Sequence, residues 1–185
     1  GLSRSQVAKV VSGFPHVLGY SIEANLKPTV AWLEAVGLSR QQVAHVVATF
    51  PQVLGCSLEA NLKPTVSWLE DVVGLSRKQV AKAIAGSPKI LSRSVKHSLK
   101  ATVAWLEEIG LSPQQVAKAV AGFPSVLGLS VVANLKPRVA WLEDLGLSRK
   151  EVAKVVADSP QVLGLSIEAR LKPTVAWLED VGLRG

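Results

Sequence analysis

The residues best suited to chemistry in this chain of 185 residues are lysines at a fixed place in a recurring pattern. Each follows a Val-Ala pair, and the set is Lys9, Lys82, Lys118 and Lys154. An ammonium group binds phosphate as a compact point charge. No acid stands at helical spacing from these lysines, apart from Asp158 beside Lys154, so we expect them to be the main phosphate contacts. The alternative, an ordinary solvated helix face, stays open.

Further lysines extend this set of candidate phosphate contacts. They are Lys78, Lys150, Lys100 and Lys136. The last two lack the glutamate that precedes their equivalents Lys27, Lys63 and Lys172 by one helical turn. A glutamate at that spacing favours a local ion pair, so we expect those three equivalents to be neutralised within their own helix.

A second column of polar residues follows a recurring proline and differs from one copy to the next. Its members are His16, Gln52, Lys89, Ser125 and Gln161. All of them can form hydrogen bonds with base edges, which makes them candidate base contacts. Neutral sequence variation at an exposed turn would look the same, and both interpretations remain open.

The sequence contains no catalytic pattern. Its histidines, His16, His45 and His97, fall at three different phases of the repeat, and Cys56 is the single cysteine. Neither a metal site nor a Cys-His pair is indicated, and no glycine-rich phosphate loop occurs. We therefore expect a protein that is not an enzyme and needs no cofactor or metal. The apolar runs are also far too short to span a membrane.

These side chains are positioned by a repeat that runs through the whole chain. Tryptophan recurs at Trp32, Trp68, Trp105, Trp141 and Trp177, a period of 36 or 37 residues. A period of this size is typical of stacked helical repeats. We expect one array with repeats at 1–36, 37–73, 74–109, 110–145 and 146–181 and a short tail at 182–185. The lack of methionine and of polar end repeats suggests an excerpt of a longer array, or a designed one.

The first helix of each repeat is expected at about 4–12 and its equivalents. Val7, Val10 and Val11 recur at helical spacing and predict its buried stripe. The helix must end before Pro15, and the next five residues suit one turn of 3₁₀ helix.

The second helix begins at the cap Ser21 and runs to about Val36, with a kink at Pro28. Ala101 replaces this proline in the third repeat, which should therefore be straighter. Its tryptophan is expected to pack between repeats, with the indole N–H near a polar partner. Stacking of the indole on a base is the alternative.

The joint between repeats is the segment Gly37-Leu38-Ser39. Glycine suits a left-handed helix end, and Ser39 with Gln42 forms a capping box for the next helix. One extra residue at Val72-Val73 predicts a local wide turn without loss of stacking.

Charge separates between the two helices of a repeat. The net charge is +7, but the first helices together carry ten basic and two acidic residues, and the second helices eight basic and twelve acidic. One basic stripe along a solenoid is expected for a protein that tracks phosphates. Arginines in the first turn, such as Arg4, are expected to pair with acids that close the preceding helix, for example Glu34 or Asp71.

The chain resembles the mitochondrial transcription termination factor family, mTERF. The resemblance rests on three recurring segments, which in the first repeat are 14–19, 21–28 and 33–39. It implies an all-α, right-handed solenoid of five repeats of about 36 residues, a positively charged path for nucleic acid, and work in mitochondria or chloroplasts. Members of the family bind duplex DNA in some cases and structured RNA in others. The repeats here are more uniform than is typical, as in a recently amplified or consensus array.

The sequence thus predicts a monomeric nucleic-acid-binding solenoid that prefers duplex DNA to RNA. A protein-interaction scaffold without nucleic-acid binding is the alternative.

Overall fold

The computed structural model describes residues 1–182, and this part of the chain contains helices and no strands. The first helices of the repeats are α1 (Arg4–Gly13), α3 (Arg40–Thr49), α5 (Arg77–Gly86), α7 (Pro113–Gly122) and α9 (Arg149–Asp158). The second helices are α2 (Lys27–Val36), α4 (Lys63–Asp71), α6 (Lys100–Glu108), α8 (Lys136–Asp144) and α10 (Lys172–Asp180). Of the expected tail at 182–185, residues 183–185 lie outside the described part.

A 3₁₀ turn follows each first helix, as expected from the recurring proline. These turns are η1 (Pro15–Gly19), η3 (Pro51–Gly55), η5 (Pro88–Ser92), η7 (Pro124–Gly128) and η9 (Pro160–Gly164). A wide, π-helical turn then leads without a break into the second helix. These wide turns are η2 (Ile22–Leu26), η4 (Leu58–Leu62), η6 (Val95–Leu99), η8 (Val131–Leu135) and η10 (Ile167–Leu171).

The wide turn occurs with and without the proline, and a straighter second helix in the third repeat stays a prediction. In the first repeat the Leu26 N–H donates to the Ser21 carbonyl, five residues back, at 3.1 Å. The third repeat has the same wide turn although it lacks the proline. All five turns share a serine whose hydroxyl accepts the N–H three residues further on. The winding therefore accompanies the serine cap and does not depend on the proline.

The joints between repeats have the expected geometry. Gly37 adopts a left-handed conformation with φ 111°, and the Leu38 N–H donates to the Leu33 carbonyl at 3.2 Å. Both hydrogen bonds of the Ser39 capping box are present. The extra residue of the second repeat is absorbed by a wide turn, because the Val73 N–H donates to the Trp68 carbonyl, five residues back, at 3.2 Å.

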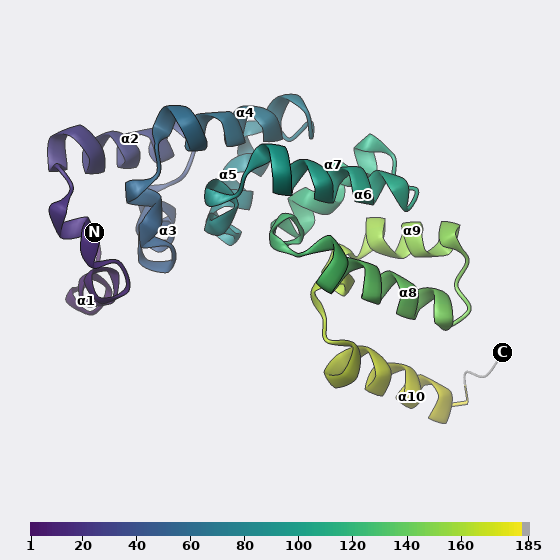
Figure 1. Cartoon of the computed structure of the whole chain (residues 1–185). Coiled ribbons are helices and arrows are strands. Elements are labelled where there is room, and N and C mark those ends of the chain that lie inside the picture. Colours follow the sequence, from purple (N-terminus) through teal and green to yellow (C-terminus); the bar gives the residue numbers. More distant parts are fainter. Residues whose placement is uncertain (183–185) are drawn as a thin grey trace.

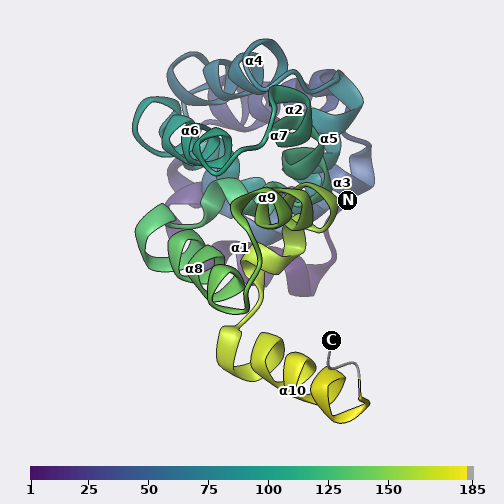
Figure 2. The same cartoon turned by 90° about the vertical axis from the view of Figure 1, so that its right-hand side faces the viewer.

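Stacking of the repeats curves the array. First helices of neighbouring repeats pack directly on one another, whereas second helices pack on the first helix and the short turns of the next repeat. The closer packing places the first helices on the inner side of the curve, as α1, α3 and α5 are seen below α2 and α4 (Figure 1). In Figure 2, with the C-terminal end toward the viewer, α4, α6, α8 and α10 pass from the top over the left to the bottom. The superhelix is therefore right-handed.

One continuous core joins the repeats. Val43 and Val46 of the predicted stripe are buried, while Val7 is 47% exposed because nothing in the described part covers the outer face of α1. Trp68 and Trp105 are buried, which confirms their packing role in the middle of the array. The expected polar partner is wrong for Trp68, because its indole N–H is buried without a hydrogen-bond acceptor among residues 1–182.

Candidate nucleic-acid interface

The lysine column lies on the exposed face of the first helices. Lys9, Lys82, Lys118 and Lys154 are all solvent-exposed, and His45 occupies the same place on α3. Because the first helices pack side by side, these residues follow one another along the row of first helices. The second turn of each first helix thus presents its cation, or the histidine, on one continuous surface.

Lys118 does not fit the expectation that these lysines lack acidic neighbours. Its ammonium lies 3.1 Å from the Asp158 carboxylate at the end of α9. The sequence placed Asp158 beside Lys154, one helical turn away, but the stacking of α7 on α9 brings it to Lys118 instead. No carboxylate lies within ion-pair distance of Lys9, Lys82 or Lys154 in the part of the chain that the structure describes.

The first-turn arginines hold repeats together. Arg40 pairs with Glu34 at 3.6 Å, and Arg77 with Glu70 at 3.3 Å, where Asp71 had been one of the expected partners. Arg77 also donates to the carbonyl of Ala35 at 3.0 Å, at the end of α2. Such a carbonyl has no partner within its own helix and carries the negative end of the helix dipole. These arginines are therefore structural contacts across repeats.

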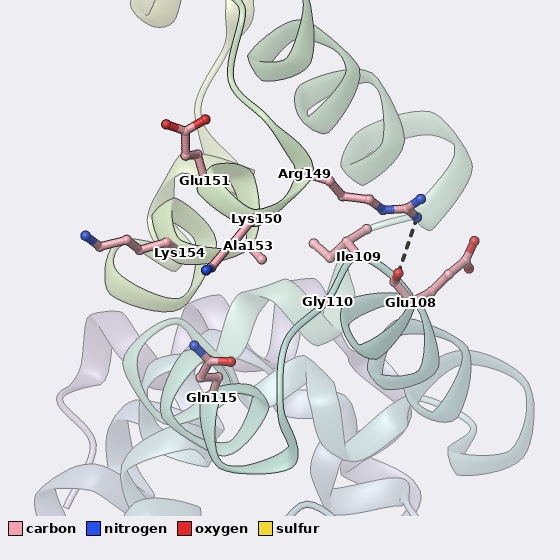
Figure 3. A pocket seen from close by; sticks show the side chains of 9 residues that line it. All are labelled: Glu108, Ile109, Gly110, Gln115, Arg149, Lys150, Glu151, Ala153 and Lys154. Atoms are coloured by element: carbon pink, nitrogen blue, oxygen red, sulfur yellow. Dashed lines mark hydrogen bonds between the residues drawn. The ribbon is translucent and has the colours of Figure 1, made fainter.

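Arg149 makes the same kind of contact at the other end of the array. It donates to the carbonyl of Glu108 at 3.3 Å, at the end of α6, as the dashed line in Figure 3 shows. A cleft of about 770 Å³ opens beside it, between the α6–α7 joint and the start of α9. Lys150, Lys154 and Gln115 line this cleft.

Two acids, Glu108 and Glu151, also line this cleft, and Glu151 is held by a cap. Glu151 accepts hydrogen bonds from the Ser148 backbone N–H at 2.8 Å and from the Ser148 hydroxyl at 2.6 Å. These bonds lower the pKa of the Glu151 carboxyl below its ordinary value. Figure 3 shows Glu151 pointing away from the cleft, while Lys150 points toward the gap between α9 and the helix that carries Gln115. The cleft therefore has three cations, Arg149, Lys150 and Lys154, against the side chain of Glu108.

The lysines of the second helices divide as the sequence indicates. Lys27 pairs with Glu23 at 2.5 Å, Lys172 pairs with Glu168 at 2.6 Å, and Lys63 pairs with Glu59. Lys100 and Lys136 are exposed and have no ion pair in the described part of the chain. They lie at the start of α6 and α8, apart from the first-helix column.

The candidate base contacts form a second column on the 3₁₀ turns. His16, Gln52, Lys89 and Gln161 are exposed, and Ser125 is half-buried. Neighbouring 3₁₀ turns contact one another, so this column runs beside the lysine column. Its members can reach a ligand, with Ser125 the least accessible.

Two arginines that bridge repeats were missed from the sequence. Arg93 donates to the Gly128 carbonyl at 2.9 Å. Arg138 donates to the Leu165 carbonyl at 2.7 Å and to the Asn134 carbonyl at 2.6 Å. Arg138 stands where the other repeats have threonine, namely Thr29, Thr65, Thr102 and Thr174. An arginine in place of the recurring threonine is the sequence feature that could have identified Arg138 as a contact between repeats.

Three further features concern chemistry outside this surface. Burial raises the pKa of the Cys56 thiol, which disfavours the reactive thiolate. Within residues 1–182, no three side chains of His, Cys, Asp or Glu gather as a metal site. None of the helices described there combines the length and the apolar character needed to cross a bilayer.

Comparison with protein families matches the whole chain, residues 1–185, to mTERF. A search of curated proteins gives no match.

Proposed function

The chain belongs to the mTERF family, and we propose that it binds nucleic acid along the inner side of its superhelix. The observation that carries the proposal is the set of exposed lysines without acidic partners on α5 and α9. Lysines on a regular scaffold neutralise phosphates and release counterions, which supplies affinity without sequence preference. Lys78, Lys82, Lys150 and Lys154 are the proposed main contacts.

The other candidates have secondary roles in this proposal. Lys9 contributes a single cation at the N-terminal end, and Lys118 is weakened by its pair with Asp158. Lys100 and Lys136 can meet phosphates only where the ligand extends toward the second helices. The column after the proline is the proposed source of base contacts, because amide, imidazole, ammonium and hydroxyl groups all reach base edges.

Duplex DNA is the preferred ligand in this proposal, and structured RNA is the second. Single-strand binders use exposed aromatic side chains on which bases stack. Trp68 and Trp105 are buried and offer no such platform, and the exposed Trp177, on α10 at the end of the array, is a single aromatic side chain and not a row of them. Phosphate contacts to a duplex need no unstacked base, so they suit a surface of lysines and small polar groups. A mitochondrial or chloroplast setting, usual for the family, is part of the proposal, as is a monomeric state.

The direct test is a binding titration with duplex DNA, single-stranded DNA and RNA of equal length at 50 and 200 mM salt. Four phosphate contacts predict a fall of about 10²-fold in duplex affinity between these concentrations. Duplex DNA should bind at least as tightly as the other two. Absence of binding to all three, or affinity that does not change with salt, would contradict the proposal and favour the protein-interaction scaffold.

A further inference from the structure

Cations are unevenly distributed over the five first helices. α5 carries Arg77, Lys78 and Lys82, here called the α5 cluster, and α9 carries Arg149, Lys150 and Lys154, the α9 cluster. At the same three positions α1 has arginine, serine and lysine, so it carries one lysine and no lysine pair. α3 has arginine, glutamine and histidine there, and α7 has proline, glutamine and the lysine that pairs with Asp158. The basic surface is therefore concentrated in two places, separated by α7.

The two clusters are built by the same contacts. The arginine of each donates to a main-chain carbonyl near the end of the second helix two repeats earlier, Ala35 for Arg77 and Glu108 for Arg149. Beside each arginine contact, an alanine of the cluster helix packs on a joint glycine. A Cβ placed on Gly37 or on Gly110 would lie 3.6 Å from the Cβ of Ala81 or Ala153. Both clusters are thus held in equivalent positions on the scaffold.

Within each cluster the two lysines stand one helical turn apart on the same face. Like charges at this spacing repel each other, which destabilises the helix slightly unless an anion lies between them. Neither pair has a carboxylate at ion-pair distance among residues 1–182. The acid in the first turn of α9, Glu151, is occupied with Ser148, and the equivalent residue on α5 is the neutral Gln79. Each lysine pair therefore carries two positive charges that no nearby carboxylate neutralises.

We propose that the α5 and α9 clusters are two separate phosphate clamps, and that α7 is a neutral spacer between them. The nucleic-acid backbone is then gripped at two points, two repeats apart, and not along a continuous stripe. This inference rests on the proposed function and adds which helices bind the backbone. The arginines fix the helix starts, and the lysine pairs contact the phosphates.

The test compares three double variants in salt titrations with duplex DNA. They are Lys78→Gln with Lys82→Gln, Lys150→Gln with Lys154→Gln, and, as a matched control, Lys9→Gln with Lys118→Gln. Each removes two charges from first helices. Each cluster variant should reduce the slope of log affinity against log salt by about two, because the slope changes by about 0.9 per phosphate. The control should reduce it by less than one.

Equal losses in all three variants would overturn the two-clamp inference and leave nucleic-acid binding itself intact. If the unaltered protein fails to bind duplex DNA, the proposed function fails and the inference falls with it. Backbone footprinting gives an independent result. Two protected segments of the DNA backbone, with an unprotected segment between them, support the two clamps. One unbroken protected segment contradicts them.

Discussion

The Lys118 ammonium on α7 lies 3.1 Å from the Asp158 carboxylate on α9. Both side chains are largely exposed, at 64% and 58%, so the pair adds little to stability, about 0–1 kcal/mol. Its main effect is on the surface, because it removes one cation from the lysine column. The pair also joins two helices whose sequence positions are 40 residues apart.

Asp158→Asn should therefore strengthen nucleic-acid binding. The change frees Lys118 and makes the slope of log affinity against log salt steeper by up to about one. Glu168→Gln is the matched control, since it frees Lys172 on the outer side of the array. A duplex DNA titration checks both variants. If Glu168→Gln strengthens binding as much as Asp158→Asn does, the effect comes from net charge and not from the position of Lys118.

Gly110→Ala should destabilise the protein. Gly110 has φ 106°, a backbone conformation that a side chain disfavours by about 1–2 kcal/mol. Gly86→Ala is the contrasting change, because Gly86 ends α5, has no positive φ, and a Cβ there meets nothing within 4 Å. It should stabilise by about 0.4–1 kcal/mol. Unfolding in guanidinium chloride, followed by circular dichroism, measures both. Equal effects of the two alanines would contradict this account of the joint.

Trp68→Phe should cost less stability than Trp105→Phe. The two indoles are equally buried, at 6% and 5% exposure. Only the Trp68 N–H is buried without an acceptor in the described part, and an unsatisfied buried donor costs about 1–3 kcal/mol. Phenylalanine removes that cost together with some apolar contact. The same unfolding measurement decides the order, and a larger loss for Trp68→Phe would mean that its N–H is satisfied in solution.

Glu151→Gln, at the start of α9, should change how the free energy of unfolding depends on pH. Hydrogen bonds from Ser148 lower the folded-state pKa of the Glu151 carboxyl below its ordinary 4.5. The stabilisation it provides is present above pH 4.5 and disappears as the pH falls through the lower folded-state pKa. The other first helices have glutamine here, at Gln6, Gln42, Gln79 and Gln115, so the variant keeps its capping box.

The measurement for this change is the free energy of unfolding of both proteins between pH 3 and 7. The unaltered protein should lose stability relative to Glu151→Gln as the pH falls toward 3. Glu143→Gln serves as a control, because the Glu143 side chain makes no hydrogen bond within residues 1–182. A pH-independent difference between the Glu151→Gln variant and the unaltered protein would show that the Ser148 bonds do not bias the titration.

Local backbone chemistry made much of the fold predictable. The left-handed Gly37, the Ser39 cap with Gln42 and the proline-initiated 3₁₀ turn depend on neighbours within a few residues. The pairing of Lys27 with Glu23 was predictable for the same reason, since both lie on one helix. Each of these features can be read within a single repeat.

The features that the sequence missed depend on how repeats stack. Asp158 meets Lys118 and not Lys154 because of the relative placement of α7 and α9, which no spacing within one helix specifies. Arg138 likewise binds the Leu165 carbonyl of the next repeat. The wide turns were hidden by the proline, which suggested a kink, although the serine cap is what they share.

The central claim is that lysines on the inner side, and not net charge, bind nucleic acid. Two quadruple variants test it, and each loses four positive charges. One replaces Lys78, Lys82, Lys150 and Lys154 by glutamine, and the other replaces Lys27, Lys63, Lys96 and Lys172. The slope of log duplex affinity against log salt should fall by about four in the first variant and by less than one in the second. Equal slopes in the two variants would contradict the account.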